Sequence, residues 1–149
     1  VTEQDLIDIY KIRIRLEGLA AAMAATKMTD EEKKALAESV ELAEFYIQKN
    51  DTEKLKELDT SFHGAIYRAS GSRILCKILS ELHRNIKAYR KLSLTVPGRL
   101  EKSVEEHREI TDAILRSDAE EADRLTSLHV ERALANLLIA TKTGDTEEN

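Results

Sequence analysis

The sequence predicts an all-α protein folded as a single six-helix antiparallel bundle, and three observations lead to this prediction. Apolar residues form 42% of the 149-residue chain, and they recur at helical spacing between short polar joints. One proline and five glycines are too few for the turns of a β-sandwich or β-barrel of this size. The length suits one domain with a sizeable core, and short joints favour antiparallel neighbours.

The first three helices follow from apolar stripes and a capping signal. The first carries apolar residues at helical spacing from Leu6 onward. Thr29 or Asp30 can cap the second helix, where Glu32 is placed to complete a capping box. A polar Asn-Asp-Thr joint then precedes the third. These helices are predicted over about residues 3–26, 30–49 and 53–69.

The last three helices are separated by glycine, proline and serine signals. The Ser70-Gly71-Ser72 joint combines a glycine suited to end one helix with a serine suited to cap the next. The Pro97-Gly98 pair marks the following break, and Ser117 or Asp118 can cap the final helix. These helices are predicted over about residues 73–94, 99–116 and 119–141.

Charge and cysteine content limit the classes of function. The net charge is −5 and the basic residues are scattered, so no concentrated basic face is expected to bind nucleic acid. A single cysteine cannot form an internal disulfide, so we expect a cytoplasmic protein. No apolar run approaches the roughly 20 residues of a membrane-spanning helix, so no membrane partner is expected.

Three of the four histidines are predicted to point into the bundle interior from three different helices. His63 shares a helix face with Asp59, four residues earlier, and apolar residues lie along the same face. His107 lies in the middle of the apolar stripe of its helix, and His129 is grouped with small apolar residues of the last helix. The sequence therefore places three imidazoles and one carboxylate in the interior.

Two interpretations of these polar groups stay open on the residues alone. Each histidine can be a core residue with its own hydrogen-bond partner, since an unpaired buried polar group costs about 1–3 kcal/mol. Alternatively, one metal ion satisfies Asp59, His63, His107 and His129 together. The fourth histidine, His83, lies towards the edge of its helix's apolar face, and we predict a boundary residue without a ligating role.

A buried arginine is predicted in the first helix. Arg13 falls within the apolar stripe of that helix, and Glu17 lies four residues further on, where it can pair with the guanidinium. One interpretation is a structural ion pair. The other is a guanidinium fixed in the same interior as the histidines and suited to binding a carboxylate.

Four sequence elements occur in an order and at separations typical of one family. They are the opening segment IYKIRIRLEGLAA at 9–21, Asp59-Thr60-Ser61-Phe62-His63 followed by Ala69-Ser70-Gly71-Ser72, the segment SVEEHREI at 103–110, and His129. Together they resemble the effector-binding domain, called FCD, of GntR-type transcription regulators of the FadR branch. A count of six helices rather than seven is more similar to the VanR-like subgroup than to FadR itself.

The resemblance implies an all-helical sensor domain over residues 1–142, and the acidic residues 143–149 are expected to form a frayed tail. By position it implies a divalent metal ion held by Asp59, His63, His107 and His129. It also implies a small carboxylic acid that completes the coordination beside Arg13. Zinc, nickel, manganese and iron all suit these donors, which do not choose among them.

We therefore predict a metal-dependent sensing domain for a small carboxylic acid, without enzyme activity, in a homodimeric transcription regulator. The resemblance implies dimer contacts through the first and fourth helices. The family's N-terminal winged helix-turn-helix is missing from a sequence that begins at Val1, and DNA would be contacted only through that domain. We expect a fragment cut at the domain boundary; a processed short protein is the alternative. The rival functions are a metalloenzyme acting on a small acid, for which Glu17 is the candidate base, and a metal-free helical dimerisation module.

Overall fold

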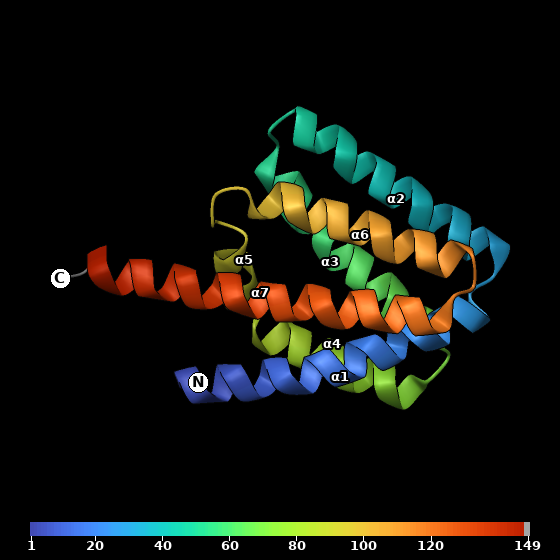
Figure 1. Cartoon of the computed structure of the whole chain (residues 1–149), viewed down its shortest axis with the longest axis horizontal. Coiled ribbons are helices and arrows are strands. Elements are labelled where there is room, and N and C mark those ends of the chain that lie inside the picture. Colours follow the sequence, from blue (N-terminus) through green and yellow to red (C-terminus); the bar gives the residue numbers. More distant parts are fainter. Residues whose placement is uncertain (148–149) are drawn as a thin grey trace.

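A computed structural model describes the backbone of residues 1–147 and the side chains of residues 1–142 (Figure 1). Of the acidic tail predicted at 143–149, the backbone of residues 143–147 is described and belongs to the last helix, whereas residues 148–149 lie outside the described residues. The described part is all-helical, as predicted. Its helices are α1 (Glu3–Lys27), α2 (Asp30–Gln48), α3 (Thr52–Ala69), α4 (Arg73–Asn85), α5 (Lys87–Ser93), α6 (Arg99–Leu115) and α7 (Ala119–Glu147).

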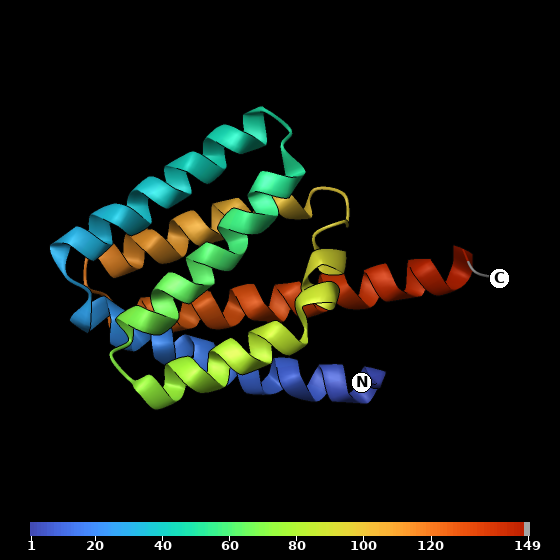
Figure 2. The same cartoon turned by 180° about the vertical axis from the view of Figure 1, so that it is seen from behind.

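The prediction of six helices is wrong for the described residues, because the fourth predicted helix divides into α4 and α5. Ile86 leaves the helical conformation, with φ −112° and ψ 17°. Its side chain is fully buried beside Tyr10 and Val130. The break lets α4 pack on α1 and α3 while α5 packs on α7, which one straight helix could not do (Figure 2). Neither glycine nor proline marks this position, so the sequence carried no signal for it.

The helix caps are those that the sequence indicates. The Thr29 side chain accepts a hydrogen bond from the backbone N–H of Glu32, whose carboxylate accepts one in return, forming the capping box. The Asp118 carboxylate accepts from the backbone N–H of Glu121 at 3.1 Å at the start of α7. Gly71 and Gly98 have φ values of 76° and 82°, which are strained for other residues.

Helices α1 and α7 run antiparallel, side by side, and both chain ends lie at the same end of the bundle (Figure 1). Gly18 makes this close approach feasible, because a Cβ there would collide with the side chains of Asp123 and Ser127. The Ser127 hydroxyl instead donates to the carbonyl oxygen of Ile14 at 3.0 Å. This pair of helices is the frame against which the shorter helices pack.

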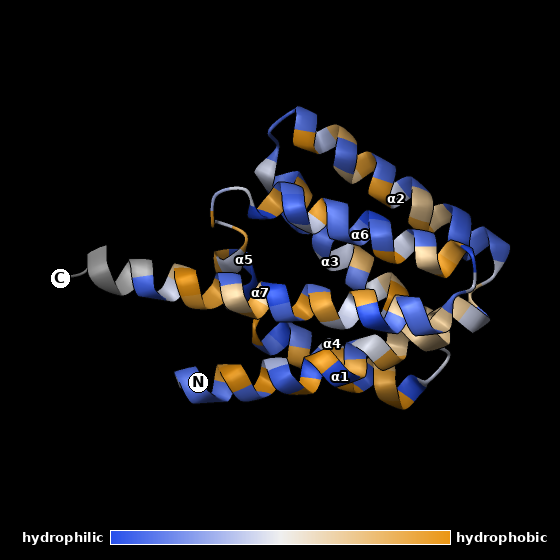
Figure 3. Ribbon diagram, viewed as in Figure 1, coloured by the Kyte–Doolittle hydropathy of each residue, from blue (hydrophilic) through white to orange (hydrophobic). Residues whose placement is uncertain are grey.

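The main core is formed by residues of α1, α2, α3, α4 and α6, with Ala122 from α7. Polar and apolar residues alternate along these helices (Figure 3). On α1 the core consists of small side chains, because Ala20, Ala21 and Ala24 are fully buried and Ala25 nearly so. Helix α2 covers the outer side, packed on α3 and α6. Among the described residues, no helix is both long and apolar enough to cross a membrane.

Candidate metal centre

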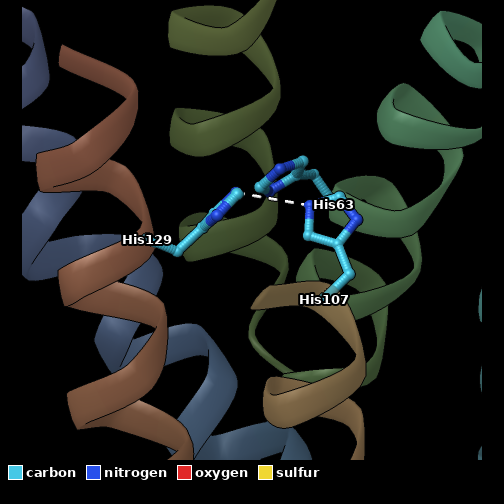
Figure 4. A group of neighbouring side chains, drawn as sticks. All are labelled: His63, His107 and His129. Carbon is cyan, nitrogen blue, oxygen red and sulfur yellow. Dashed lines mark hydrogen bonds between the residues drawn. The ribbon is translucent and has the colours of Figure 1, made fainter. Parts of the chain in front are cut away.

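Three buried histidines meet inside the bundle, one each from α3, α6 and α7 (Figure 4). His63, His107 and His129 are each about 5% exposed or less, and one ring nitrogen from each lies within 4.8 Å of the others. They come from segments far apart in the sequence. The structure thus brings together all three histidines that the sequence directs to the interior.

The separation of the ring nitrogens suits a shared metal ion. His107 Nε2 and His129 Nε2 are 3.3 Å apart, and this is the interaction drawn as a dashed line in Figure 4. Two nitrogens bound tetrahedrally to zinc at about 2.0–2.1 Å lie about 3.3 Å from each other, so the pair needs little adjustment. Asp59 Oδ1 lies 3.6 Å from His107 Nε2 and 3.8 Å from His63 Nε2. Asp59 thus lies next to His63 and His107, but among the described residues only the three histidines bring donor atoms that all lie within 4.8 Å of one another.

Two carboxylates orient the histidines from behind. Glu17 Oε1 lies 3.1 Å from His63 Nδ1, and Glu106 Oε1 lies 2.7 Å from His129 Nδ1. An ionised carboxylate only accepts hydrogen bonds, so each of these Nδ1 atoms carries its proton and each Nε2 keeps its lone pair. A carboxylate or carbonyl behind a histidine is the usual partner of a metal-binding imidazole.

Both carboxylates are ionised. Burial raises the pKa of Glu106, but the hydrogen bonds from His129 and Arg99 outweigh this and lower the pKa to about 2. Burial likewise acts against ionised Glu17, yet Arg13 and His63 hold its pKa well below its usual range. The Tyr67 hydroxyl also donates to Glu17, at 2.5 Å.

The ring of His107 is positioned by an aromatic contact rather than by a carboxylate. Its ring stacks on Phe62, with centroids 3.9 Å apart and planes 12° from parallel. Burial, together with the neighbouring His129, holds the pKa of His107 well below its usual value. Burial also lowers the pKa of His129, although Glu106 opposes the shift. Both rings are therefore neutral at neutral pH, which is the state that binds metal.

Arg13 is buried and paired with Glu17 as the spacing predicts. The distance from Arg13 Nη2 to Glu17 Oε2 is 2.6 Å, and the guanidinium lies 4.7 Å from the ring centroid of Tyr10. Arg13 Nε and Nη1 have no hydrogen-bond partner in the described part of the chain. Arg13 lines a cavity beside the histidines, together with Asp59, His63 and His129.

Sequence reasoning missed three charged residues of this region: Arg90, Arg99 and Glu106. Arg90 Nη2 donates to Asp59 Oδ2 at 3.1 Å, and Arg99 forms two hydrogen bonds with Glu106, at 2.8 and 3.1 Å. Glu106 lies directly before His107 in the segment 103–110, so this motif could have identified it as a residue of the site. Arg90 and Arg99 follow the break at Ile86 and the Pro97-Gly98 joint, where helix periodicity fails as a guide to orientation.

The prediction that His83 lies at a boundary is wrong. Its side chain is 6% exposed, its ring centroid is 5.2 Å from that of His63, and the ring also contacts Tyr67. Burial and the nearby His63 lower the pKa of His83 to about 2. Its Nε2 has no partner among the described residues, and His83 does not belong to the group of converging nitrogens. Its place against Tyr67 comes from the packing of α4 on α3, which periodicity along α4 does not reveal.

Comparison with known proteins decides the family. The family model of the FCD domain matches residues 8–132. The chain belongs to the FCD family. It is 31% identical over 131 residues to the HTH-type transcriptional regulator YdhC of Bacillus subtilis, and 29% identical over 138 residues to the HTH-type transcriptional repressor GlaR of Escherichia coli. Both alignments cover 87% of this chain.

A solved structure shows the same fold. The chain superposes on Escherichia coli McbR/YncC with a TM-score of 0.82 and 25% sequence identity, covering 93% of this chain and 66% of that one. The FCD chain spans 58% of the length of YdhC and 63% of that of GlaR. This FCD chain therefore corresponds to one domain of relatives that are named as HTH-type transcription regulators. Membership of this regulatory family confirms the prediction that it is not an enzyme.

Proposed function

We propose that this FCD domain senses a small carboxylic acid at a divalent metal centre. The observation that carries the proposal is the convergence of three imidazoles on one point, two of them oriented by buried carboxylates. Asp59, His63, His107 and His129 would hold the ion. A bound zinc, nickel, manganese or iron ion would supply a Lewis-acidic position for a carboxylate oxygen.

Arg13 would hold the effector beside this position. Its side chain is buried and ion-paired with Glu17, and its Nε and Nη1 atoms have no hydrogen-bond partner among the described residues. Hydrogen bonds from a charged guanidinium to a carboxylate are among the stronger ones in proteins. Arg13 lies one helix turn before Glu17, which orients His63, so effector contacts and the metal centre share one network on α1.

The signal would pass to a second copy of the chain. Four apolar side chains are exposed on the outer sides of α1 and α4, which suits a homodimer formed through these helices. They are Ile12 (48% exposed), Leu19 (46%), Ile74 (75%) and Ile78 (41%). An effector that favours one packing of α1 would change the relative placement of DNA-binding domains attached to the two protomers, provided that it binds the two packings with different affinity. DNA itself would be bound by the winged helix-turn-helix domain of the full regulator.

The narrower assignment to the FadR branch and its VanR-like subgroup rests on the four motifs alone. The six-helix count that favoured the subgroup does not hold, because α4 and α5 are separate helices. Membership of the FadR branch remains part of this proposal, whereas the VanR-like subgroup has no support from the structure.

A metal-free dimerisation module is the second candidate, and hydrogen bonding favours it. Each histidine of the centre already has a partner: His63 has Glu17, while His129 has both Glu106 and His107. In this interpretation each of the three histidines has a hydrogen-bond partner without a metal ion.

Thermal denaturation with and without metal tests the proposal. Small carboxylates should raise the melting temperature of the metal-loaded protein and have little effect on the chelated protein. An effector at a hundredfold excess over its Kd adds about 2.7 kcal/mol to the free energy of unfolding. Arg13→Gln should lose this response while keeping its metal, and Arg15→Gln, two residues along the same helix, should respond normally. The absence of any response from a broad carboxylate panel with metal present would contradict the proposal.

A further inference from the structure

The joint between α3 and α4 lies at the edge of the bundle (Figure 2), and a cavity opens there to solvent. This α3–α4 cavity has a volume of about 410 Å³, which is in the range of small-molecule sites. Helix α3 contributes Arg68 to its lining, and α4 contributes Arg73 and Lys77. It shares no lining residue with the cavity beside the histidines, so it is a separate place in the molecule.

Every charged side chain that lines the α3–α4 cavity is a cation. Arg68, Arg73 and Lys77 are exposed, and none of these side chains forms an ion pair or a hydrogen bond with a described residue. A groove of similar volume between α6 and α7, about 420 Å³, is different, because three glutamates line it together with three cations. The α3–α4 cavity therefore has an excess of positive charge that the described part of the chain does not balance.

The sequence around the cavity is basic, in contrast to the rest of the chain. Residues 68–91 contain seven lysines and arginines but a single acidic residue, Glu81, although the whole chain has a net charge of −5. Lys27, the last residue of α1, adds to this charge from a third helix. Its Nζ would lie 3.5 Å from a Cβ added at Gly71, which lines the cavity, and it too has no ion pair among the described residues.

Positive charge concentrated in a hollow attracts compact anions, because a cavity lined by one sign of charge focuses its field. A phosphate group carries about two negative charges and three acceptor oxygens, so it can contact guanidinium and ammonium groups on several sides at once. A carboxylate offers one charge and two oxygens. The hydroxyls of Ser72 and Ser80 also line the cavity and can donate further hydrogen bonds. This set of donors favours a phosphate over a carboxylate.

The cavity also stays accessible in the homodimer proposed above. That dimer would use Ile74 and Ile78 of α4. Successive residues of a helix are rotated by about 100°, so Cys76, two positions from each isoleucine, lies on nearly the opposite side of α4. Because Cys76 lines the cavity, the cavity faces away from the proposed dimer contact.

We infer that the α3–α4 cavity binds a small phosphorylated compound, whose phosphate is held by Arg68, Arg73 and Lys77. A cavity of this volume suits a small molecule, and the net charge of −5 gives the chain no general attraction for a nucleic acid. The site needs neither a metal ion nor Arg13, so it goes beyond the proposed function. A compound bound there would link the end of α3 to the start of α4, which packs on α1.

Pyrophosphate is the probe for this site, and nuclear magnetic resonance of the isotope-labelled chain at physiological salt locates where it binds. We expect the largest amide shifts at residues 68–80, and calorimetry gives the affinity. Arg73→Gln and Lys77→Gln should each weaken binding about tenfold or more, since each removes charge-assisted hydrogen bonds to the anion. Arg84→Gln is the matched control: it removes the same charge from an exposed position of α4 outside the cavity and should bind like the wild type.

Citrate tests whether the site selects phosphate or only negative charge. It carries a similar charge on carboxylates and should bind more weakly than pyrophosphate. Metal content and the circular dichroism spectrum are measured for every variant, because both anions also bind metal ions. None of the substituted residues belongs to the candidate metal centre, so these variants should keep the metal content of the wild type.

Pyrophosphate that fails to bind at millimolar concentration would overturn the inference, as would citrate that binds equally well. Equal weakening in Arg84→Gln would also overturn it, because the attraction would then belong to the whole basic surface. Shifts centred on His63, His107 and His129 would contradict it by placing the anion at the candidate metal centre. Each of these results leaves the proposed carboxylate sensing intact, since that function is tested by separate variants at Arg13.

Discussion

The inward faces of the two halves of α1 bury different chemistry. From Ala20 to Ala25 the inward face consists of alanines that pack against the main core. Glu17 and Arg13, one and two turns earlier, are just as inaccessible, at 1% and 3% exposed, and they face the histidine centre. The alanine half gains from close packing, whereas the polar half must satisfy charges away from water.

This comparison separates residues that stabilise the fold from residues that would bind a ligand. Replacing a buried ion pair by apolar residues of similar volume often leaves a protein equally stable or more so. The stability of the bundle therefore does not explain why arginine, glutamate and histidine occupy this half. Binding of an ion and an anion would explain it, and variants in each half can separate the two roles.

The largest effect is expected for Glu106, which contributes both to the stability of the fold and to the candidate metal centre. Glu106→Gln removes the carboxylate that pairs with buried Arg99 and orients His129. We expect unfolding to become easier by about 3–5 kcal/mol, since a buried charge loses its partner. Metal affinity should fall about 10–100-fold, because His129 loses the group that fixes its tautomer. Chemical denaturation and metal titration measure the two effects; unchanged metal affinity would contradict the role of Glu106.

A core variant one turn away provides the matched control. Ile110, on the same helix as Glu106 and His107, is 1% exposed and belongs to the main core. Ile110→Ala should lower the free energy of unfolding by about 2–5 kcal/mol through the cavity it leaves. It should nevertheless bind metal like the wild type below its melting temperature. If it lost metal as Glu106→Gln does, metal loss would reflect general destabilisation rather than the centre.

The smallest effect concerns DNA. The chain has a net charge of −5 and its helices pack with buried faces, so specific binding to duplex DNA is not expected from this domain alone. The most basic stretch includes Arg84, Lys87 and Lys91, but Arg90, which lies among them, is turned inward to Asp59. A gel-shift titration at physiological salt should show no retained complex. Salt-sensitive binding at micromolar concentration would contradict this prediction.

Periodicity and capping were sufficient to predict most of the fold, because these signals lie within single helices. Asp59, His63, His107 and His129 could be placed in the interior for the same reason: each lies on the apolar stripe of a long helix. The break at Ile86 is a tertiary effect, caused by α4 and α5 packing on different helices, and it has no local signal.

The error on His83 and the omission of Arg90 have one cause. A residue near the edge of one helix's apolar face can still be covered by another helix, and only the packing of α4 on α3 shows that His83 is covered. Arg90 faces Asp59 only because α5 takes a direction of its own after the break. Glu106 was within reach of sequence reasoning, since it lies one position before His107 in the motif.

Elemental analysis of the purified chain, prepared without chelator and without added metal, tests the central claim most directly. The account predicts close to one divalent ion per chain in the wild type and most of it lost in His107→Ala, with His83→Ala as the control. That control is a buried histidine beside the centre that offers no converging nitrogen. A wild-type chain without metal, or equal metal in both variants, would contradict the account and favour the metal-free module.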